Sequence, residues 1–461
     1  MTKFKSDAVL FVYSILGVFT LSYTSFVHDF SAVYAAIFAS VLFGPCWATI
    51  YTSVLGTVKQ EHREVAGAVV VMSIIGAAVV PAIHGYVSDT LGSLQLAFVV
   101  PTLCFIYVGY YFWDKMKLEK RRGIMETKLF LFKELFSRDK KVLLSNNDFT
   151  VFGFKYESGI EAIKICNKKG FIIVLPFYGQ IIWDAEFGKH SLKMKNMFSE
   201  PKFGNSIVDT YGCFAFHSGL IRNGCPSPED DHVLHGEMPC SIINNAWLII
   251  DNNSITLTGE VEYVKGFGNH YSARPAVTLY SNSTLFDIQM SVTNLSSVDM
   301  PLQYMCHMNY AYIPNATFSQ NIPDEILRLR ESVPSHVNPT AQWLAFNQRI
   351  MQGEASLSTL SQPEFYDPEI VFFADKLDAY TDQPEFRMIS PDGTTFVTRF
   401  YSAELNYVTR WILYNGEQQV AAFALPATCR PEGYLAAQRN GTLIQVAPQQ
   451  TRTFTVTTGI E

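Results

Sequence analysis

Charged residues are absent from four long stretches in the first quarter of the chain. Residues 8–28, 30–58, 65–88 and 90–113 contain no Asp, Glu, Lys or Arg. Each stretch is at least as long as the roughly 20 apolar residues that cross a bilayer core as a helix. Charged residues return after Trp113. The pattern therefore predicts four transmembrane helices within residues 1–115.

The rest of the chain has a different periodicity, in which apolar and polar residues alternate. The clearest alternation involves Ile255, Leu257, Val261, Tyr263, Phe286, Ile288, Met290, Val292, Phe454 and Val456. A period of two predicts strands with one buried face. Turn signals recur at Asn223-Gly224, Asp251-Asn252-Asn253, Pro391-Asp392-Gly393 and Asn440-Gly441. We expect a basic linker over residues 116–130 and a large all-β sandwich over residues 131–461.

Lys and Arg residues lie on alternate connections of the predicted membrane part. They occur in residues 1–7, in the loop 59–64 and in the segment 115–122, but not around residues 28–29 or 89–95. Positively charged loops stay on the cytoplasmic side of a membrane. The distribution predicts a multi-pass protein of the inner (cytoplasmic) membrane, in contact with the lipid bilayer through residues 8–113. The β-sandwich is expected to face the cytoplasm.

The distribution of charge excludes one class of partner. The formal net charge is −7, and the chain has no Lys- and Arg-rich tract with interleaved aromatic residues. Such a tract is the usual footprint of a surface that binds nucleic acid. We therefore expect no nucleic-acid partner.

Segments of the membrane part resemble a transporter family. They are Phe43-Gly44-Pro45-Cys46-Trp47-Ala48-Thr49-Ile50, the run from Ala66 to Pro81, and Gly85-Tyr86-Val87-Ser88-Asp89. Together they are similar to the late helices of the fucose-permease branch of the major facilitator superfamily of sugar transporters. The resemblance covers residues ~10–113, the counterpart of the last four of that family's twelve helices. It implies the remainder of a sugar permease as a partner, because the substrate site of such transporters lies between two halves.

A first cluster of polar residues in the β-rich part could carry chemistry. It runs from Asp230 to Pro239 and contains His232, His235 and Glu237 beside a Gly and a Pro. The two histidines, with Glu237, could bind zinc, although the spacing alone is a weak signal and no second ligand pair lies nearby. A hydrogen-bonded loop and a carbohydrate site are the other interpretations.

A second cluster runs from Tyr304 to Tyr312 and follows the alternating strand 285–295. In a strand, its His307 and Asn309 lie on the same face. A His and an amide surrounded by Tyr side chains could form a sugar platform. A buried core histidine is the alternative interpretation of His307.

The two clusters belong to a set of motifs that resembles one superfamily. The motifs are Gly159-Ile160-Glu161-Ala162, the segment from Leu175 to Asp184, Met197-Phe198-Ser199-Glu200-Pro201, Leu234-His235-Gly236-Glu237-Met238-Pro239, His307-Met308-Asn309 and Leu425-Pro426-Ala427-Thr428. They are similar to the aldose 1-epimerase (galactose mutarotase) superfamily, and most similar to its DUF4432 branch, over residues ~130–461. The resemblance implies a mutarotase-like β-sandwich that binds a monosaccharide, an aldose, with no cofactor and no metal ion.

The resemblance also implies roles for individual residues. Mutarotation needs a general acid at the ring oxygen and a general base at the anomeric hydroxyl. By this likeness, His307 is the acid, His235 holds the sugar and Arg222 binds the substrate. Asn309, His232, Trp183 and Arg274 are further candidates for contacts with the sugar. Core burial is an equal alternative for Trp183, and a structural ion pair for Arg274.

The family's general base is a Glu, and this chain departs from the pattern there. Leu425 stands at the matching position, and a Leu cannot accept a proton. Glu237 is the substitute that we expect, with Glu432 as the second candidate. If neither carboxylate acts, the domain binds sugar without catalysing mutarotation.

These observations predict a membrane-tethered cytoplasmic carbohydrate-binding domain. Its expected activity is that of an aldose 1-epimerase-like sugar isomerase, which uses acid–base chemistry at the anomeric centre. The alternative is a non-catalytic sugar-binding module attached to a sugar transporter or to a fragment of one. A permease joined to such a domain would deliver sugar to it at high local concentration.

Overall fold

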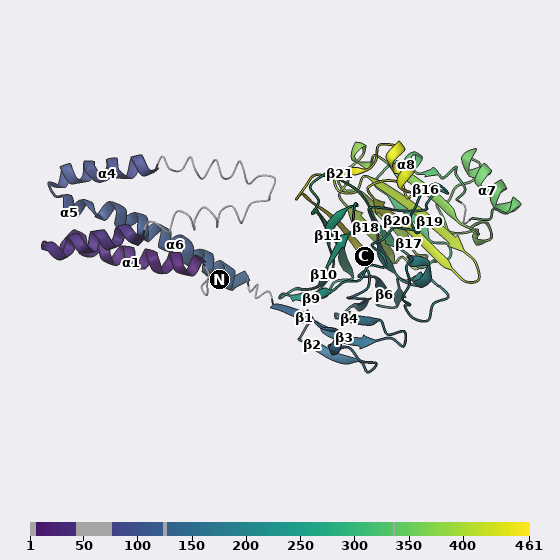
Figure 1. Cartoon of the computed structure of the whole chain (residues 1–461), viewed down its shortest axis with the longest axis horizontal. Coiled ribbons are helices and arrows are strands. Elements are labelled where there is room, and N and C mark those ends of the chain that lie inside the picture. The colour runs from purple at the N-terminus through teal and green to yellow at the C-terminus, as the bar shows by residue number, and fades with distance from the viewer. Residues whose placement is uncertain (1–5, 43–75, 123–126, 335–336) are drawn as a thin grey trace. The chain divides into compact units, whose positions relative to one another are not determined.

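Residues 6–42, 76–122, 127–334 and 337–461 are described by the computed structural model. The chain divides into two compact units, Met1–Ile124 and Met125–Glu461. Figure 1 shows the helices of the first unit in purple to blue, and the second unit as a body of strands. The division lies within the stretch 116–130 that the sequence analysis assigns to a linker.

The described residues of the first unit are mostly helical. Its elements are α1 (Ser6–Phe26), a short apolar helix Phe30–Leu42, α4 (Gly76–Leu91), α5 (Leu94–Ala97) and α6 (Val99–Arg122). Two stretches, Val9–Phe26 and Leu94–Asp114, are long and apolar enough to cross a bilayer. Only 33% and 28% of these stretches are buried inside the structure. Most residues of both stretches are therefore half-buried or exposed in the structure.

These two stretches coincide with the first and the fourth of the predicted transmembrane spans. Of the second span, the structure describes residues 30–42, which all belong to the apolar helix Phe30–Leu42. The third span is described from Gly76 onward as α4, a helix of 16 residues. Residues 43–75, which include the loop 59–64, lie outside the described residues. The structure thus supports two of the four spans, and the count of four stays a prediction.

The described residues of the second unit form two antiparallel sheets, one of nine strands and one of thirteen. In spatial order the nine-stranded sheet consists of β1 (Thr127–Leu131), β9 (Asn245–Ile250), β10 (Ser254–Val264), β11 (His270–Tyr280), β12 (Leu285–Asn294), β22 (Thr451–Ile460), β18 (Thr395–Phe400), β17 (Glu385–Ile389) and β14 (Thr317–Gln320).

The main path of the thirteen-stranded sheet is β15 (Arg328–Leu329), β16 (Ile370–Asp375), β19 (Tyr407–Tyr414), β20 (Gln419–Ala427), β13 (Met300–Met308), β8 (Ala215–Leu220), β6 (Ile182–Phe187), β5 (Gly170–Val174), β4 (Glu161–Cys166), β3 (Thr150–Lys155) and β2 (Lys141–Ser145). Off this path, β21 (Ile444–Val446) pairs with β13 and β7 (His190–Ser191) with β6. Short helices connect the strands: α7 (Ala341–Met351), α8 (Tyr434–Arg439) and 3-10 turns at Lys133–Leu135, Ile207–Thr210, Asp324–Ile326, Pro363–Phe365 and Leu377–Ala379.

The alternation in the sequence corresponds to one buried face per strand. Along β12 the buried positions Phe286, Ile288, Met290 and Val292 alternate with half-buried ones. Phe286 stacks on Phe187 of the other sheet, with ring centroids 5.9 Å apart, so the buried faces of the two sheets meet in one apolar core. The prediction of a large all-β domain is confirmed.

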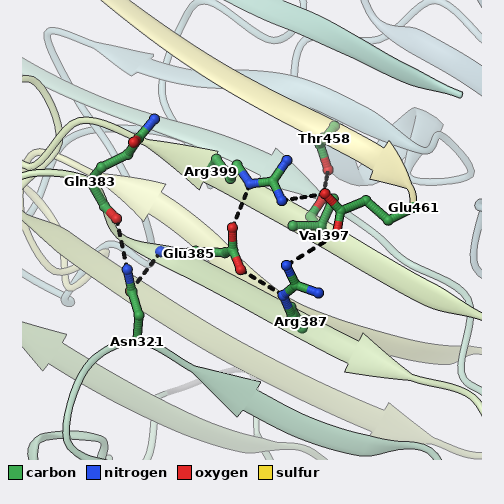
Figure 2. A network of polar contacts seen from close by, with 8 residues as sticks. All are labelled: Asn321, Gln383, Glu385, Arg387, Val397, Arg399, Thr458 and Glu461. Carbon is green, nitrogen blue, oxygen red and sulfur yellow. Dashed lines mark hydrogen bonds and ion pairs between the residues drawn. The ribbon is translucent and has the colours of Figure 1, made fainter. Parts of the chain in front are cut away.

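A network of charges ties the C-terminal strand to its neighbours (Figure 2). Glu385 of β17 accepts hydrogen bonds from Nε of Arg387 at 2.6 Å and from Nε of Arg399 at 2.5 Å. The same two arginines bind the carboxylate of Glu461, Arg387 at 3.1 Å and Arg399 at the other oxygen. The network therefore links β17, β18 and the residue that follows β22.

Candidate functional site

One face of the thirteen-stranded sheet lines a cavity of about 700 Å³. Strand residues spaced two apart contribute to its wall: Val371 and Phe373 from β16, Thr409, Trp411 and Leu413 from β19, and Met305 and His307 from β13. Side chains two apart share one face of a strand, so sheet pairing collects these distant segments on a single surface. Ligand pockets commonly have volumes of roughly 300–1,000 Å³.

His307 lies among aromatic rings in this cavity. It pairs in register with Phe216 of β8, and the two rings stack with centroids 4.5 Å apart. The ring of His235 lies 4.7 Å from that of His307, and the ring of Trp411 lies 5.7 Å away. The hydroxyl of Tyr211 lies 3.2 Å from Nε2 of His307. His235 and His307 are thus in close contact in the structure.

Burial controls the charge of His307. Only 3% of the residue is exposed. Burial lowers the pKa of its imidazole to about 3, and a smaller effect of the Asn309 side chain acts to raise this pKa. An imidazole in an apolar site is neutral at neutral pH, because the protonated ring loses its hydration. His307 can therefore donate or accept a hydrogen bond there without carrying a charge.

His235 is held by its own loop. It adopts a left-handed conformation with φ of 63°, and its amide donates to the carbonyl of Gly224 at 2.9 Å. Its Nδ1 lies 3.0 Å from Oγ of Ser218, which donates in turn to Oδ1 of Asn223 at 2.5 Å. Oγ of Ser218 also lies 3.3 Å from the carbonyl oxygen of His235. This chain fixes the orientation of the ring at the cavity wall.

A buried ion pair that no sequence motif indicates forms another part of the wall. Arg330 contacts Glu369 at 2.7 Å, with 9% and 11% of their side chains exposed. The other oxygen of Glu369 accepts from Nε1 of Trp411 at 2.7 Å. Glu369 thereby orients the indole that faces His307. Because Arg330 and Glu369 are 39 residues apart in the chain, their contact leaves no local pattern in the sequence.

Of the residues to which the sequence assigns an individual role or departure in the site, four line the cavity: His235, His307, Leu425 and Glu432. Leu425 is 1% exposed and pairs with Thr409 of β19. Glu432 is half-buried, and its Oε1 lies 3.4 Å from the hydroxyl of Ser332. Leu425 therefore presents an apolar surface where the family resemblance expects a carboxylate.

Glu237 does not line the cavity. Its Oε1 accepts hydrogen bonds from the amides of Leu220 at 2.9 Å and Ile221 at 2.7 Å, and from the hydroxyl of Tyr271 at 3.0 Å. Three donors on one carboxylate oxygen are an arrangement that braces a loop. The position of Glu237 does not support the prediction that this residue is the general base.

Arg222, His232 and Asn309 also lie outside the cavity wall. Nε of Arg222 lies 3.4 Å from Asp231, and its guanidinium lies over the ring of Tyr434 at 3.9 Å. Nδ1 of His232 contacts the carbonyl of Val233 at 2.8 Å. The amide of Asn309 donates to the carbonyl of Cys213 at 3.0 Å. Each of the three has a structural partner in its own neighbourhood.

Trp183 and Arg274 lie elsewhere in the domain. Trp183 is 3% exposed and packs in a second apolar cluster with Ile160 and Leu175. Arg274 belongs to β11 of the nine-stranded sheet and contacts Glu260 at 3.0 Å. These positions fit the alternatives of core burial for Trp183 and of a structural ion pair for Arg274. Among the described residues, no three His, Cys, Asp or Glu side chains cluster as metal ligands would.

Comparisons with known proteins agree with the two units. No family model matches the chain, so its place in the DUF4432 branch stays a prediction. Over 101 residues it is 30% identical to a glucose/galactose transporter of Brucella abortus, which covers 22% of this chain and 23% of the transporter. It is 26% identical over 125 residues to the L-fucose-proton symporter of Haemophilus influenzae, which covers 26% of this chain and 29% of the symporter. The chain spans about a quarter of the length of these curated relatives.

Among solved structures, a candidate aldose 1-epimerase from Klebsiella pneumoniae is similar with a TM-score of 0.60 and 14% sequence identity. The match covers 73% of this chain and 91% of that protein. At this identity the likeness concerns the fold. The β domain thus has the fold of aldose 1-epimerase-like proteins, and the N-terminal part is similar to sugar transporters, as the sequence motifs indicate.

Proposed function

We propose that the β domain binds an aldose in the cavity over His307. The observation that carries the proposal is the contact between His235 and His307, whose rings lie 4.7 Å apart at the wall of a cavity of about 700 Å³. Trp411 adds an aromatic surface on which a pyranose ring can stack, and the hydroxyl of Tyr211 adds a polar group. Such an arrangement of apolar walls and few polar groups is typical of small-molecule sites.

The proposed reaction is interconversion of the two anomers. A base takes the proton of the anomeric hydroxyl, the bond between C1 and the ring oxygen breaks, and the ring oxygen takes a proton from an acid. Closure of the aldehyde from its other face then reverses these transfers. We assign the acid position to His307 and the base position to Glu432, because Glu432 lines the cavity and Glu237 does not.

A non-catalytic sugar-binding module is the second candidate function. Leu425 supports it, because an apolar side chain occupies the cavity at the place of the family's base. The neutral state of His307 supports it as well, since a ring with a pKa of about 3 is rarely protonated at neutral pH. Under this alternative the two histidines serve only as hydrogen-bonding partners of the sugar.

The two candidate functions differ in one measurable rate. The full chain, in lipid nanodiscs without sugar headgroups, would be mixed with glucose, galactose or fucose, and anomer exchange followed by saturation-transfer NMR. Exchange faster than in buffer that is lost in both His307→Ala and Glu432→Gln would establish the enzyme. Saturable binding with the buffer rate of exchange would establish the binding module. No binding of any aldose would refute the proposal.

We also propose that the N-terminal helices hold this domain at the cytoplasmic face of the inner membrane, next to the remainder of a sugar permease. The apolar stretches Val9–Phe26 and Leu94–Asp114 and the similarity to two sugar transporters support this. Fusions of green fluorescent protein and of alkaline phosphatase to the C-terminus test the orientation. Fluorescence without phosphatase activity is expected, and the reverse result would place the domain outside the cytoplasm.

A further inference from the structure

A second pocket adjoins the cavity over His307. Its volume is about 310 Å³, and Glu432 and Ala436 line both spaces. Ala436 belongs to α8, and the backbone of Glu432 forms a bridge with Gly224. The two spaces are therefore neighbours that share one short stretch of wall.

The size of the first cavity already exceeds the needs of one sugar ring. Pockets of roughly 300–1,000 Å³ bury drug-sized ligands, and a single pyranose ring is much smaller than such a ligand. A monosaccharide over His307 would leave a large part of the 700 Å³ to water. The unfilled part and the second pocket together provide room for a further sugar unit.

The second pocket is polar and electrically balanced among its described residues. Asp375 and Glu432 oppose Lys376 and Arg430 in its wall. Arg430 binds both oxygens of Asp375, with its Nε at 2.9 and 3.0 Å and a terminal nitrogen at 2.6 Å from one of them. The hydroxyl of Tyr407 can offer a neutral hydrogen bond beside this pair.

This balance favours one ligand chemistry over another. An anionic ligand, such as a phosphate or a sugar acid, would compete with Asp375 for Arg430 and would lie near Glu432. Bringing like charges together in a partly buried site is unfavourable. An uncharged polyhydroxy ligand can instead donate to the carboxylates and accept from the cations without breaking the ion pair.

We infer that the site takes two linked sugar units, an uncharged disaccharide or the end of a longer oligosaccharide. One ring occupies the cavity over His307, and the next ring extends past Glu432 and Ala436 into the pocket beside Arg430. The inference rests on the function proposed above and names its ligand class. It predicts that a disaccharide gains affinity from residues that a monosaccharide does not reach.

The test compares monosaccharides with disaccharides on the full chain in nanodiscs without sugar headgroups. Tryptophan fluorescence would report binding of glucose, galactose and fucose, and of maltose, cellobiose and lactose. We expect at least one disaccharide to bind about tenfold more tightly than either of its component sugars. Saturable binding of monosaccharides with no tighter disaccharide would overturn the inference and leave the proposed function intact. No binding of any sugar would overturn both.

Variants in the second pocket test the position of the second ring. Thr442 and Tyr407 line this pocket but not the first cavity. Thr442→Phe fills the pocket and is expected to remove the disaccharide advantage without changing monosaccharide affinity, whereas Thr442→Ser, the matched control, keeps the advantage.

Tyr407→Phe provides a second variant that removes only a hydroxyl, in case the filled pocket prevents folding. It should reduce disaccharide affinity by roughly two- to tenfold, the usual contribution of one neutral hydrogen bond. An unchanged disaccharide advantage in both Thr442→Phe and Tyr407→Phe would show that the second ring does not lie in this pocket.

Discussion

The hydroxyl oxygen of Tyr211 lies 3.2 Å from Nε2 of His307 at the wall of the cavity. Burial raises the pKa of Tyr211 well above its ordinary value and lowers that of His307 to about 3. The contact is therefore a hydrogen bond between two neutral groups at neutral pH. This hydrogen bond fixes the orientation of the imidazole ring, and so determines which edge of the ring a ligand in the cavity would contact.

Removing this hydroxyl should weaken sugar binding. A neutral hydrogen bond contributes about 0.5–1.5 kcal/mol, so Tyr211→Phe is expected to lower the affinity for an aldose by roughly two- to tenfold. Fluorescence titration measures the effect. Tyr312→Phe is the matched control, because its hydroxyl donates to the carbonyl of Leu360 at 3.0 Å, away from the cavity wall. Equal losses in the two variants would contradict a specific role for Tyr211.

Two buried histidines should make the stability of the β domain depend on pH. Burial lowers the pKa of both His217 and His307 from an ordinary value of 6.5 to about 3. Between these values the unfolded chain binds more protons than the folded chain. Stability therefore rises with pH across this window and is lost as the pH falls from 6.5 toward 3. Each histidine contributes a slope of up to about 1.4 kcal/mol per pH unit.

Melting temperatures at pH 7 and pH 5 test this dependence. His217 is the better target because it does not line the cavity, and a Gln can replace its hydrogen bond with Tyr304. We expect a smaller loss of melting temperature between the two pH values in His217→Gln than in the wild type. His270→Gln is the control, since His270 is partly exposed beside Glu262. The same pH dependence in wild type and His217→Gln would show that His217 does not contribute.

The sequence predicted best the features of the fold that depend on residues close together in the chain. The alternation of Phe286, Ile288, Met290 and Val292 identified the buried face of β12, because the period of a strand is local. Motif likeness identified His235 and His307 for a different reason, since the two are 72 residues apart. Their contact depends on the register between β13 and β8 and on the loop of His235.

Proximity in sequence was misleading at Glu237. It follows His235 by two residues, yet His235 lines the cavity and Glu237 does not. His235 and Gly236 both adopt positive φ values, of 63° and 78°, so the chain turns sharply between the two side chains. Conversely, Arg330, Glu369 and Trp411 meet only after β16 pairs with β19. No spacing rule anticipates either result.

The charge network at the C-terminus should stabilise the nine-stranded sheet. Glu385 lies between Arg387 and Arg399, and their side chains are 27%, 34% and 24% exposed. Glu385→Gln would leave two partly buried arginines with weaker partners, and we expect a loss of about 1 kcal/mol in unfolding free energy. Urea denaturation measures it. Lys168→Gln is the control, because its pair with Asp148 is more exposed, at 59% and 39%. Equal stabilities of the two variants would argue against a special contribution of the network.

Leu425 and His307 line the cavity from the neighbouring strands β20 and β13. The antiparallel pair of Met305 with Ala427 sets the register between these strands. Leu425 and His307 each lie two residues from this pair, and both line the same cavity. A carboxylate at position 425 would therefore lie in the same cavity as the imidazole, where it would raise the pKa of His307 by favouring the charged ring.

Replacing Leu425 tests whether the lack of a carboxylate at this position limits catalysis. Leu425→Glu supplies a proton acceptor and a charge that favours protonated His307, whereas Leu425→Gln supplies nearly the same volume without the charge. Because acid–base groups each accelerate reactions by roughly 100-fold or more, we expect anomer exchange in the Glu variant to exceed that of the wild type and of the Gln variant by about that factor. Saturation-transfer NMR measures it. If the Glu variant folds, binds aldose and exchanges anomers no faster than the Gln variant, the lack of a carboxylate at this position is not what limits exchange.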